Sequence, residues 1–596
     1  MTGYKVEKLP FDSMVINQWG QLEEESDNWP VVYTLSNDDE IYVGETVNAA
    51  TRLTQHLHSS SKKHLERVQI ILNETFNKSV CLDLESHLIR YFAADGKHRV
   101  LNANAGITDA NYFNRETYRE TFNELFELMV KDGMLTRSVP EIINSNLFKF
   151  SPFKALNSEQ AIALSGVIER VISDIKADKS SQLVIQGDPG TGKTIVAIYL
   201  IKLLRDLSRV SRDDLLEQES VFSDFFTEEV ALLLKDLEIA LVVPQQSLRA
   251  TLQTVFTQTP GLNKAMVMTP FEVGESNKMF DILIVDESHR LGQRANQSSA
   301  MQNKKFKEIN LKLFGSDDGS ITQLDWIIKK SRHQLLLLDT AQSIKPADLP
   351  LVKTNQLIDQ ARVSDSLFKL SSQMRVMGGN GYLDFVKNLF TNSPTRAVNF
   401  QGYDLRFYDD LGKMQEDILA LNEDHGLSRL LAGFAWEWKT KRDPQLFDIE
   451  IGGVKLRWNQ TAKDWVNSPT SHLEVGSIHT IQGYDLNYAG VIIGNDLGYD
   501  PVQKKLIFRR DQYFDVKGKE NNDRLGIKYT DEDLLELVSN IYKVLMTRGI
   551  KGTFIYVCDT ALAQRLAELA RSPYGEINPH WLQLDPLEQG GDVASV

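Results

Sequence analysis

The octapeptide GDPGTGKT at residues 187–194 constrains this chain more than any other feature. It fits the pattern G-x-x-x-x-G-K-[ST], and it lies between an apolar strand-like run at 183–186 and a helical pattern at 194–204. Glycines let backbone N–H groups close around phosphate oxygens, the lysine supplies a point charge, and the last hydroxyl can ligate Mg²⁺. The segment therefore predicts an ATP site formed by Gly187, Gly190, Thr191, Gly192, Lys193 and Thr194.

Two carboxylates later in the chain complete a hydrolytic site. Residues 281–285 form a second apolar strand, and Asp286 and Glu287 follow it directly. Asp286 can hold Mg²⁺, and Glu287 can orient and deprotonate the attacking water. A bare Asp-Glu pair is usually a solvated strand end. Because this pair follows a P-loop, the sequence predicts the hydrolytic pair instead.

Apolar strands alternate with helical patterns from residue 156 onward. This alternation predicts α/β layers with parallel sheets, because parallel strands need crossover helices between them. The total of 596 residues corresponds to about three to five domains. The candidate strands are residues 183–186, 239–243, 282–285, 335–338, 491–493 and 553–557.

Composition excludes several classes of protein. Cys81 and Cys558 are too few for a disulfide framework or a four-cysteine zinc site. There is no apolar leader of signal-peptide length and no apolar run of about 18 residues, so we expect a cytoplasmic chain without a membrane span. The net charge of −15 argues against a protein that coats nucleic acid by bulk charge. Residues 46–104 are locally basic, which fits a phosphate-binding surface or a solvated charged face equally well.

Four further polar signals follow the P-loop in an ordered series. Gln342 follows the strand at 335–338, Arg375 ends the segment SSQMR, residues 482–485 read QGYD, and Arg548 lies in VLMTRG. Together with the P-loop, this series resembles the superfamily 1 helicases. The resemblance implies that Gln160 contacts adenine, Gln342 senses the γ-phosphate, and Arg375 and Arg548 serve motifs IV and VI. It also assigns Asp286 and Glu287 to motif II and Gln482, Gly483 and Asp485 to motif V.

A narrower resemblance covers residues 156–570. The segments AGFAW at 432–436, RWN at 457–459, IHTIQGYD at 478–485 and VLMTRG at 544–549 are similar to the helicase-like family related to the C-terminal ATPase of long Schlafen proteins. The family implies two RecA-like lobes, with arginines of the second lobe acting on nucleotide held by the first. Such arginines are worth about 10³–10⁵ in rate. Base-stacking or core packing remains open for Trp436, Trp438, Trp458 and Trp465.

The N-terminal part carries a second ordered constellation. The strands at 31–35 and 41–43 form a predicted hairpin with a turn at 37–39, and helices are expected at 48–57 and 81–94. The order of side chains resembles the GIY-YIG nuclease domain over residues 29–105, although Val31 stands where the family has glycine. The resemblance implies catalytic roles for Tyr33, Tyr42, Arg52 and His56, a metal ligand in Glu85, and a structural contact from Asn102 or Asn104.

The residue roles follow from the same resemblance. Glu85 would bind one Mg²⁺ or Mn²⁺ that polarises the scissile phosphate, and Tyr33 would position or deprotonate the water. Arg52 would stabilise the pentavalent phosphate, Tyr42 would hydrogen-bond within the site, and His56 would transfer the proton. A degenerate domain that binds nucleic acid without cutting is the alternative.

We therefore expect an α/β chain in which a small α+β GIY-YIG domain precedes two RecA-like P-loop lobes with parallel sheets. Its expected function is ATP-dependent nucleic-acid processing by a superfamily 1 motor coupled to a metal-dependent endonuclease, with a role in anti-phage defence. ATP and Mg²⁺ are the expected cofactors, nucleic acid is the expected partner with DNA favoured over RNA, and self-assembly or a partner protein fits equally. The expected domains are residues 1–105 (nuclease-like), 106–155 (helical connector), 156–345 (lobe 1), 346–570 (lobe 2) and 571–596 (irregular tail).

Two rival functions stay open. The first is an ATP-switched sensor whose N-terminal domain recognises a nucleic-acid structure without cutting it. The second is a translocase that hydrolyses ATP without separating strands.

Overall fold

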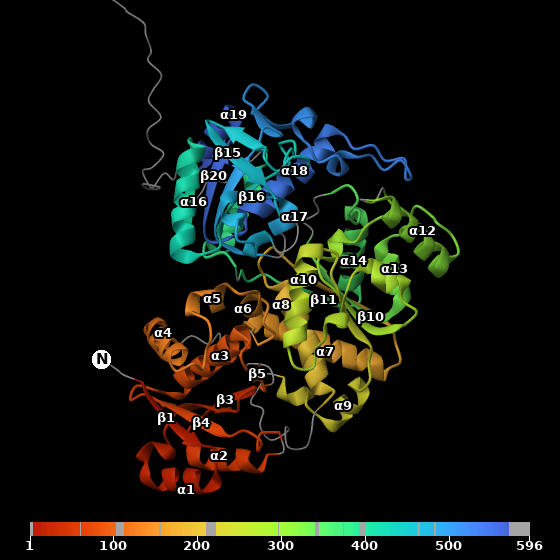
Figure 1. Ribbon diagram of the computed structural model, residues 1–596. Coiled ribbons are helices and arrows are strands. Elements are labelled where there is room, and N and C mark those ends of the chain that lie inside the picture. The colour runs from red at the N-terminus through yellow and green to blue at the C-terminus, as the bar shows by residue number, and fades with distance from the viewer. Residues whose placement is uncertain are drawn as a thin grey trace, which may run out of the picture. The chain divides into compact units, whose positions relative to one another are not determined.

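The computed structural model describes residues 4–59, 61–102, 112–153, 156–209, 222–295, 297, 299–339, 345–373, 375–391, 400–461, 465–481 and 484–570. The chain divides into two compact units (Figure 1). The first comprises Met1–Thr340 and Ala347–Ser372, and the second comprises Ala341–Pro346 and Gln373–Val596. No helix in the described ranges has the length and apolar character that a bilayer crossing requires.

The first unit begins with a five-stranded sheet in the order β1-β4-β2-β3-β5. Its pairs are antiparallel except for β3 and β5. In the central strand β2, Val31, Tyr33 and Leu35 pack toward helices α1 and α2, whereas Val32 packs toward α3, as the two-residue period of a strand requires. The elements are β1 (Lys5–Pro10), α1 (Ser13–Leu22), β2 (Val31–Ser36), β3 (Glu40–Thr46), α2 (Ala49–His58), β4 (Arg67–Leu72), α3 (Lys78–Asp95) and β5 (Arg99–Val100).

This arrangement confirms the predicted hairpin and both predicted helices. Helix α3 begins three residues before the predicted start, because the Asn77 side chain accepts a hydrogen bond from the Val80 amide and caps an earlier first turn. Gly96 ends α3 in the left-handed conformation.

The connector packs against this domain. Phe126 of α4 stacks on Tyr91 of α3 with ring centroids 4.1 Å apart, and Phe122 and Phe153 join the same buried cluster. The connector helices are α4 (Arg115–Lys131), α5 (Val139–Asn144) and α6 (Asn146–Lys149).

A six-stranded parallel sheet follows, in the order β11-β6-β10-β9-β7-β8. Leu183 and Ile185 of β6 pack toward α7, α8 and α10, whereas Val184 packs toward α13 and α14, so helices cover both faces. The elements are α7 (Ser158–Lys176), β6 (Ser181–Gly187), α8 (Lys193–Leu207), α9 (Glu228–Leu234), β7 (Ile239–Val242), α10 (Gln246–Gln258), β8 (Val267–Met268), α11 (Pro270–Glu275), β9 (Phe280–Val285), α12 (Ala300–Phe314), α13 (Gln323–Lys330), β10 (Ser331–Leu338), α14 (Leu351–Val363) and β11 (Leu367–Leu370).

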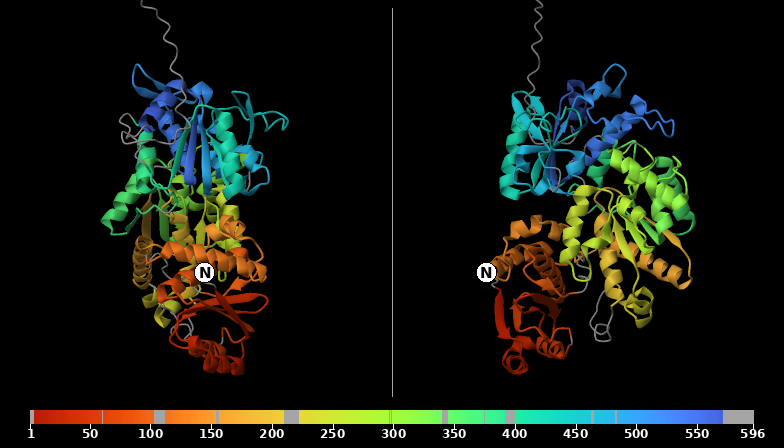
Figure 2. Two further views of the ribbon diagram at one scale, coloured as in Figure 1. Left: turned by 90° about the vertical axis from the view of Figure 1, so that its left-hand side faces the viewer. Right: turned by 45° about the vertical axis from the view of Figure 1, so that its right-hand side comes forward.

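The second unit contains a seven-stranded sheet in the order β12-β20-β17-β13-β16-β15-β14, parallel except for the β14–β15 pair. Helix α16 covers one face, and α15, α18 and α19 cover the other (Figure 2). The elements are α15 (Gly379–Leu389), β12 (Asp404–Tyr408), α16 (Leu411–His425), β13 (Ser428–Ala432), β14 (Ile449–Ile451), β15 (Val454–Trp458), β16 (Glu474–Gly476), α17 (Ile478–Ile481), β17 (Leu486–Ile493), β18 (Leu497–Asp500), β19 (Lys505–Phe508), α18 (Asp531–Met546), β20 (Gly549–Val557) and α19 (Thr560–Ala570).

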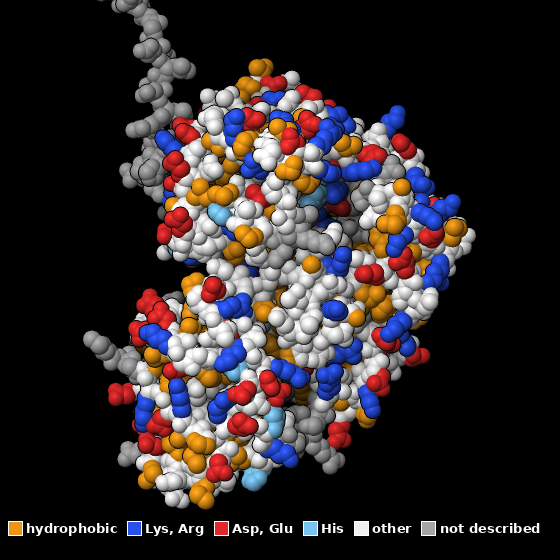
Figure 3. Space-filling view, viewed as in Figure 1, with side chains coloured by type: hydrophobic (Ala, Val, Ile, Leu, Met, Phe, Trp, Pro, Cys, Tyr) orange, Lys and Arg blue, Asp and Glu red, His pale blue; other side chains and the backbone are white. Residues whose placement is uncertain are grey.

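The two parallel sheets confirm the predicted α/β fold class. Each candidate strand of the sequence corresponds to a buried strand of one of these sheets. On the face shown in Figure 3, acidic and basic side chains are intermingled, with no extended field of one sign.

Candidate functional site

The predicted phosphate loop lies between β6 and α8. Gly190 and Gly192 have φ angles of +84° and +81°, in the left-handed region that favours glycine. A Cβ on Gly192 would lie 2.4 Å from Nε2 of Gln160, so a side chain is also sterically excluded there. These glycines therefore bring the first turn of α7 against the loop.

Lys193 is buried at the start of α8. Its ammonium donates to the carbonyl oxygens of Gly187 at 2.6 Å and Asp188 at 3.0 Å. The carboxylate of Asp339, at the end of β10, lies 3.4 Å from the same ammonium. An incoming phosphate would compete with these acceptors for the lysine. The predicted sensor Gln342 lies outside the described residues, and Asp339 was not predicted as a contact of Lys193.

The two predicted Mg²⁺ ligands of this site are in direct contact. Thr194 Oγ1 donates to Asp286 Oδ2 at 2.8 Å. Burial raises the pKa of Asp286, and the neighbouring Glu287 raises it further, while Thr194 and Lys193 oppose the shift. Oxygen ligands of this kind suit Mg²⁺, so the residues present fit the ion that the P-loop implies.

Glu287 follows Asp286 with a φ of +49°, in the left-handed region that non-glycine residues seldom adopt. Its Oε2 lies 3.1 Å from Nε2 of His289. The Asp339 amide donates to Nδ1 of His289 at 3.3 Å. Burial holds the pKa of His289 well below its usual value. Although Nε2 and the Glu287 Oε2 atom are close, their geometry is not that of a hydrogen bond. Sequence reasoning missed His289, although its place two residues after Glu287 was a usable signal.

Gln160 belongs to the first turn of α7. It forms a capping box with Asn157, in which each side chain accepts the other's backbone amide. Its Nε2 also donates to the Thr191 carbonyl at 2.8 Å. The predicted adenine contact is therefore held against the phosphate loop by its own amide.

The second unit brings three of its predicted motifs together. Arg375 Nε lies 2.5 Å from Oδ1 of Asp485, which joins motifs IV and V. Arg548, which is buried, donates through Nη1 to the Tyr484 carbonyl at 3.5 Å and so joins motif VI to motif V. Gln482 and Gly483 lie outside the described residues.

The segments that resemble the Schlafen-related family also converge. The ring of Phe434 lies 5.3 Å from both Trp458 and His479, which belong to two of the other three segments. Asn459 has a φ of +43°, and its Oδ1 accepts from the Ser477 amide and the Thr480 hydroxyl, both at 2.9 Å. Asn459 thus caps α17, the helix that leads into motif V.

The tryptophans separate into two groups. Trp458 and Trp465 are 1% and 0% exposed, so both are core residues and the base-stacking interpretation is wrong for them. Trp436 is half-buried and Trp438 is 37% exposed, which leaves only these two at the surface.

Three of the predicted nuclease residues, Tyr33, Tyr42 and His56, meet on the face of the N-terminal sheet that α1 and α2 cover. Tyr33 Oη and His56 Nε2 are 2.7 Å apart, and the Tyr42 ring lies 5.2 Å from the His56 ring. A Cβ on Gly44 would lie 2.4 Å from Tyr33 Oη. Gly44 is therefore what allows the tyrosine to lie across β3 and reach α2.

Electrostatics keep this cluster neutral at its centre. Burial lowers the pKa of His56 to about 2, with smaller contributions from Lys62 and Arg52. Burial also raises the pKa of Tyr33 well above its usual value, while Arg52 opposes this shift and Glu85 adds to it. Both Arg52 and Glu85 are therefore within electrostatic reach of Tyr33.

Lys62 is a member of this cluster that sequence reasoning counted only as a basic residue. It is buried, and its ammonium lies 4.0 Å from the centroid of the Tyr42 ring. No local sequence pattern marks a lysine in a turn as a buried one. Tertiary packing alone identifies it.

The neighbouring contacts support the site. Asn102 donates to the Val43 carbonyl at 2.7 Å and accepts from the Val43 amide at 3.0 Å, so it acts as a structural contact beside Gly44. Asn104 lies outside the described residues. Val31 is fully buried in the core formed with α1 and α2, where it packs instead of contacting the polar side chains.

A metal at this site would rely on few protein ligands. No group of three or more His, Cys, Asp or Glu side chains in the described ranges could enclose an ion. Glu45 Oε2 is buried without a hydrogen-bond partner. Burial raises the pKa of the Cys81 thiol, and the nearby charges of Glu45 and Glu85 raise it further. Mg²⁺ is commonly held by one or two carboxylates together with water and substrate phosphate, so the residues present fit such an ion.

Comparison with known families agrees with both halves of this geometry. The profile described as Schlafen group 3, DNA/RNA helicase domain matches residues 180–559, more than half of the chain. The chain therefore belongs to the Schlafen group 3 helicase family. The profile described as GIY-YIG catalytic domain matches residues 30–98. The predicted fusion of these two domains, and the predicted fold class, are confirmed.

Individual relatives are distant. An uncharacterised protein of Saccharomyces cerevisiae, YPL245W, is 26% identical over 446 residues, which cover 69% of this chain and 92% of that protein. A solved complex of the arterivirus nonstructural protein 10 helicase with DNA aligns at 11% identity with a TM-score of 0.26. That alignment covers 67% of this chain and 65% of the helicase, less than two thirds of its length.

Proposed function

We propose that this protein is an ATP-dependent nucleic-acid-processing enzyme in which a superfamily 1 translocase or helicase motor is coupled to a metal-dependent endonuclease. The observation that carries the proposal is the presence of two separate side-chain sets on one chain. One set joins Thr194 to Asp286 at 2.8 Å, and the other joins Tyr33 to His56 at 2.7 Å. ATP is the proposed fuel, and DNA is favoured over RNA as substrate.

In the proposed motor, Lys193 binds the β- and γ-phosphates, Thr194 and Asp286 hold Mg²⁺, and Glu287 deprotonates the attacking water. His289, whose Nε2 lies 3.1 Å from Oε2 of Glu287, is assigned to positioning that carboxylate. Gln160 and Gln342 are assigned to adenine and γ-phosphate contacts. Arg375 and Arg548 are assigned to transition-state charge, and Gln482, Gly483 and Asp485 to coupling with nucleic acid.

In the proposed nuclease, Glu85 holds Mg²⁺ or Mn²⁺, which when bound polarises the scissile phosphate. Tyr33 positions the water, and His56, whose Nε2 lies 2.7 Å from the Tyr33 hydroxyl, is assigned to proton transfer. Arg52 stabilises charge on the phosphate, with Tyr42 bridging within the site. The proposed domain limits 1–105, 106–155 and 571–596 are kept, but the predicted boundary between the lobes at 345/346 moves to 372/373, because residues 347–372 belong to the first unit and β11 pairs with β6.

A role in anti-phage defence is proposed from the resemblance to nuclease-helicase fusions. Expression of the chain in a bacterial host should lower phage plating efficiency, and variants of either site should lose that protection. Lack of protection across a broad phage panel, with both activities intact in vitro, would remove this role and leave the enzymology standing.

A second candidate function is an ATP-switched nucleic-acid sensor. Tyr33 and His56 are both 0% exposed, which favours a closed site that binds without cutting. In that case a partner protein would respond to the nucleotide state. The cleavage test described next separates this sensor from the proposed motor-nuclease.

The test is cleavage of labelled single- and double-stranded DNA and RNA with Mg²⁺ or Mn²⁺, with and without ATP. Glu85→Gln should abolish cutting and keep ATP hydrolysis, whereas Lys193→Ala should abolish hydrolysis. Glu74→Gln, an exposed charge of the same domain, is the matched control. Normal hydrolysis in Lys193→Ala would sink the P-loop assignment, and absence of cutting on every substrate with hydrolysis intact would favour the sensor.

A further inference from the structure

The first turn of α7 contacts two segments that are far apart in the sequence. Gln160 reaches the phosphate loop through the Thr191 carbonyl at 2.8 Å. The residue before it, Glu159, reaches the segment that follows β11. One helical turn therefore touches both the nucleotide loop and the end of the neighbouring strand.

Glu159 holds that segment by both of its carboxylate oxygens. Oε1 accepts from the Ser371 amide at 2.8 Å and also from the Ser371 hydroxyl. Oε2 accepts from the Ser372 amide at 2.7 Å. Burial alone would raise the pKa of Glu159, but the hydrogen bonds from Ser371 and Ser372 outweigh burial and lower it. The carboxylate is therefore a charged acceptor for two consecutive amides.

Ser371 and Ser372 lie where the chain passes from the first unit to the second. Ser372 is the last residue of the first unit, and Gln373 is the first of the following stretch of the second. Strand β11, which precedes the serines, pairs in parallel with β6, the strand that leads into the phosphate loop. A Cβ on Gly187 would lie 3.0 Å from the Leu370 carbonyl, so the two strand ends are tightly apposed.

The residues beyond the anchor lead directly to a predicted catalytic arginine. Gln373 Oε1 accepts from the Arg375 amide at 2.7 Å and from the Val376 amide at 3.3 Å, which fixes the turn that carries Arg375. The path from Glu159 to Arg375 thus consists of the Ser371 and Ser372 hydrogen bonds followed by this turn.

We infer that Glu159 is a positioning residue of the motor. It anchors Ser371 and Ser372, where the chain passes from the first unit to the second, and so links nucleotide occupancy of the phosphate loop to the placement of Arg375. The inference rests on the proposed ATPase function. Gln160 contacts the phosphate loop, and Glu159 is one residue earlier on the same helix. A displacement of the loop would therefore move Glu159 together with Ser371 and Ser372. A helix is a suitable lever because its first turn is fixed by the Asn157–Gln160 capping box.

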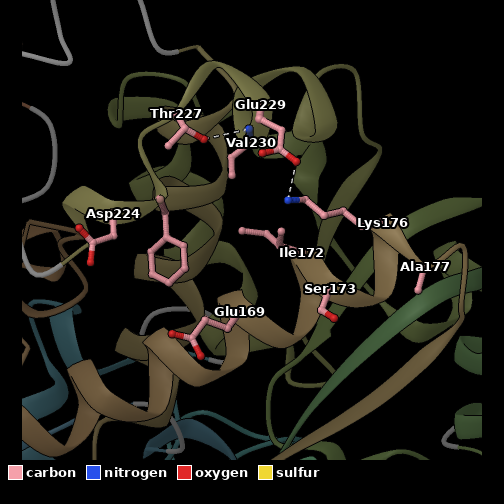
Figure 4. A pocket seen from close by; sticks show the side chains of 10 residues that line it. Glu169, Ile172, Ser173, Lys176, Ala177, Asp224, Thr227, Glu229 and Val230 are labelled. Atoms are coloured by element: carbon pink, nitrogen blue, oxygen red, sulfur yellow. Dashed lines mark hydrogen bonds and ion pairs between the residues drawn. The ribbon is translucent and has the colours of Figure 1, made fainter.

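Backbone amide exchange in the full-length chain tests the anchor without requiring turnover. Wild type, Glu159→Ala and Glu169→Gln are compared with and without a non-hydrolysable ATP analogue and Mg²⁺. Glu169 is an exposed carboxylate of the same helix α7 and lines a surface pocket between α7 and α9 (Figure 4), so it serves as the matched control. We expect the Ser371 and Ser372 amides to exchange at least tenfold faster in Glu159→Ala, and the analogue to protect residues 373–391 only in the other two proteins.

Steady-state kinetics supply the second readout. Glu159→Ala should lower kcat for nucleic-acid-stimulated ATP hydrolysis about tenfold while KM for ATP stays within twofold, because the phosphate-binding groups are untouched. Glu159→Gln should lie between wild type and Glu159→Ala, since an amide offers one acceptor oxygen instead of two. A fall in thermal stability alone would not separate kcat from KM in this way.

Each outcome has one meaning. Unchanged exchange at Ser371 and Ser372, or equal analogue protection of residues 373–391 in Glu159→Ala and wild type, would overturn the inference. Protection of the phosphate loop by the analogue without any response at residues 373–391 in wild type would overturn it as well. If the analogue protects neither region in wild type, the proposed ATP site fails, and with it the motor that Glu159 would serve.

Discussion

Thr194 and Asp286, the two predicted Mg²⁺ ligands of the P-loop site, are hydrogen-bonded to each other at 2.8 Å. The contact places a hydroxyl from the start of α8 against a carboxylate from the end of β9. Asp286 is completely buried, and burial is the main reason that its pKa lies above the usual value, followed by the charge of Glu287.

Binding of Mg²⁺ and ATP should therefore release a proton. At a pH between the ordinary and the raised pKa, free Asp286 carries a proton that a metal-bound carboxylate cannot keep, so affinity should rise with pH through that window. Calorimetry at pH 6 in two buffers of different ionisation enthalpy measures the released proton. Because the ATP phosphates also release protons at this pH, Asp286→Asn is the reference and should release fewer protons than wild type. Equal proton release by the two proteins would contradict the prediction.

His56 should remain neutral throughout the working range of the nuclease. Its pKa is lowered to about 2, first by burial and then by Lys62 and Arg52. Because this pKa lies below pH 5, the ring should not change charge between pH 5 and pH 8. The pH profile of the cleavage rate should therefore show no inflection near pH 6.5 that is due to His56, and His56→Gln should not change the shape of that profile. Ring chemical shifts of His56 recorded across this range check the point without turnover; a titration within it would refute the assignment.

Gly44→Ala should disrupt the nuclease site through packing. The new Cβ would lie 2.4 Å from Tyr33 Oη and 2.5 Å from its Cζ, so the ring must move away from His56. Overpacking of this kind costs about 1–3 kcal/mol. We expect lower thermal stability and at least tenfold slower cleavage, with ATP hydrolysis unchanged. Gly381→Ala, whose Cβ would meet its nearest neighbour at 3.9 Å, is the control and should leave both measurements near wild type.

Asp496→Asn should change how stability depends on pH. Asp496 is completely buried and accepts from Tyr542 Oη at 2.6 Å, and burial raises its pKa to about 7. Because the folded pKa lies above the unfolded one, the folded state loses stability as pH rises from about 4 to about 7. An uncharged asparagine escapes this loss.

The free energy of unfolding of Asp496→Asn minus that of wild type should increase by about 2 kcal/mol between pH 5 and pH 8. Thermal melts of the full chain at the two pH values measure the difference. Asp523→Asn, an exposed carboxylate of the same unit, should show no comparable change. A pH-independent effect of Asp496→Asn would mean that Asp496 is charged in the folded protein.

The sequence predicted the features that depend on local pattern. Fixed spacing identifies the phosphate loop, because its glycines, lysine and threonine lie in one continuous stretch of sequence between a strand and a helix. The alternation of strands and helices predicted parallel sheets, and the turn residues 37–39 between the strand-like runs 31–35 and 41–43 predicted a hairpin. The order of motifs in each half predicted the fusion of a GIY-YIG domain with a Schlafen-type helicase domain.

Only the tertiary structure decided which residues meet across these elements. Lys62, from the turn after α2, contacts the Tyr42 ring of β3, and His289 joins Asp339 because β9 and β10 are adjacent in the sheet. The partnership of Glu159 with Ser371 and Ser372 spans more than 200 residues, and no local pattern encodes such a contact. Burial, which decides the protonation of Asp286 and His56 and the core role of Trp458, is likewise a property of the assembled fold, because neighbours distant in sequence exclude the water.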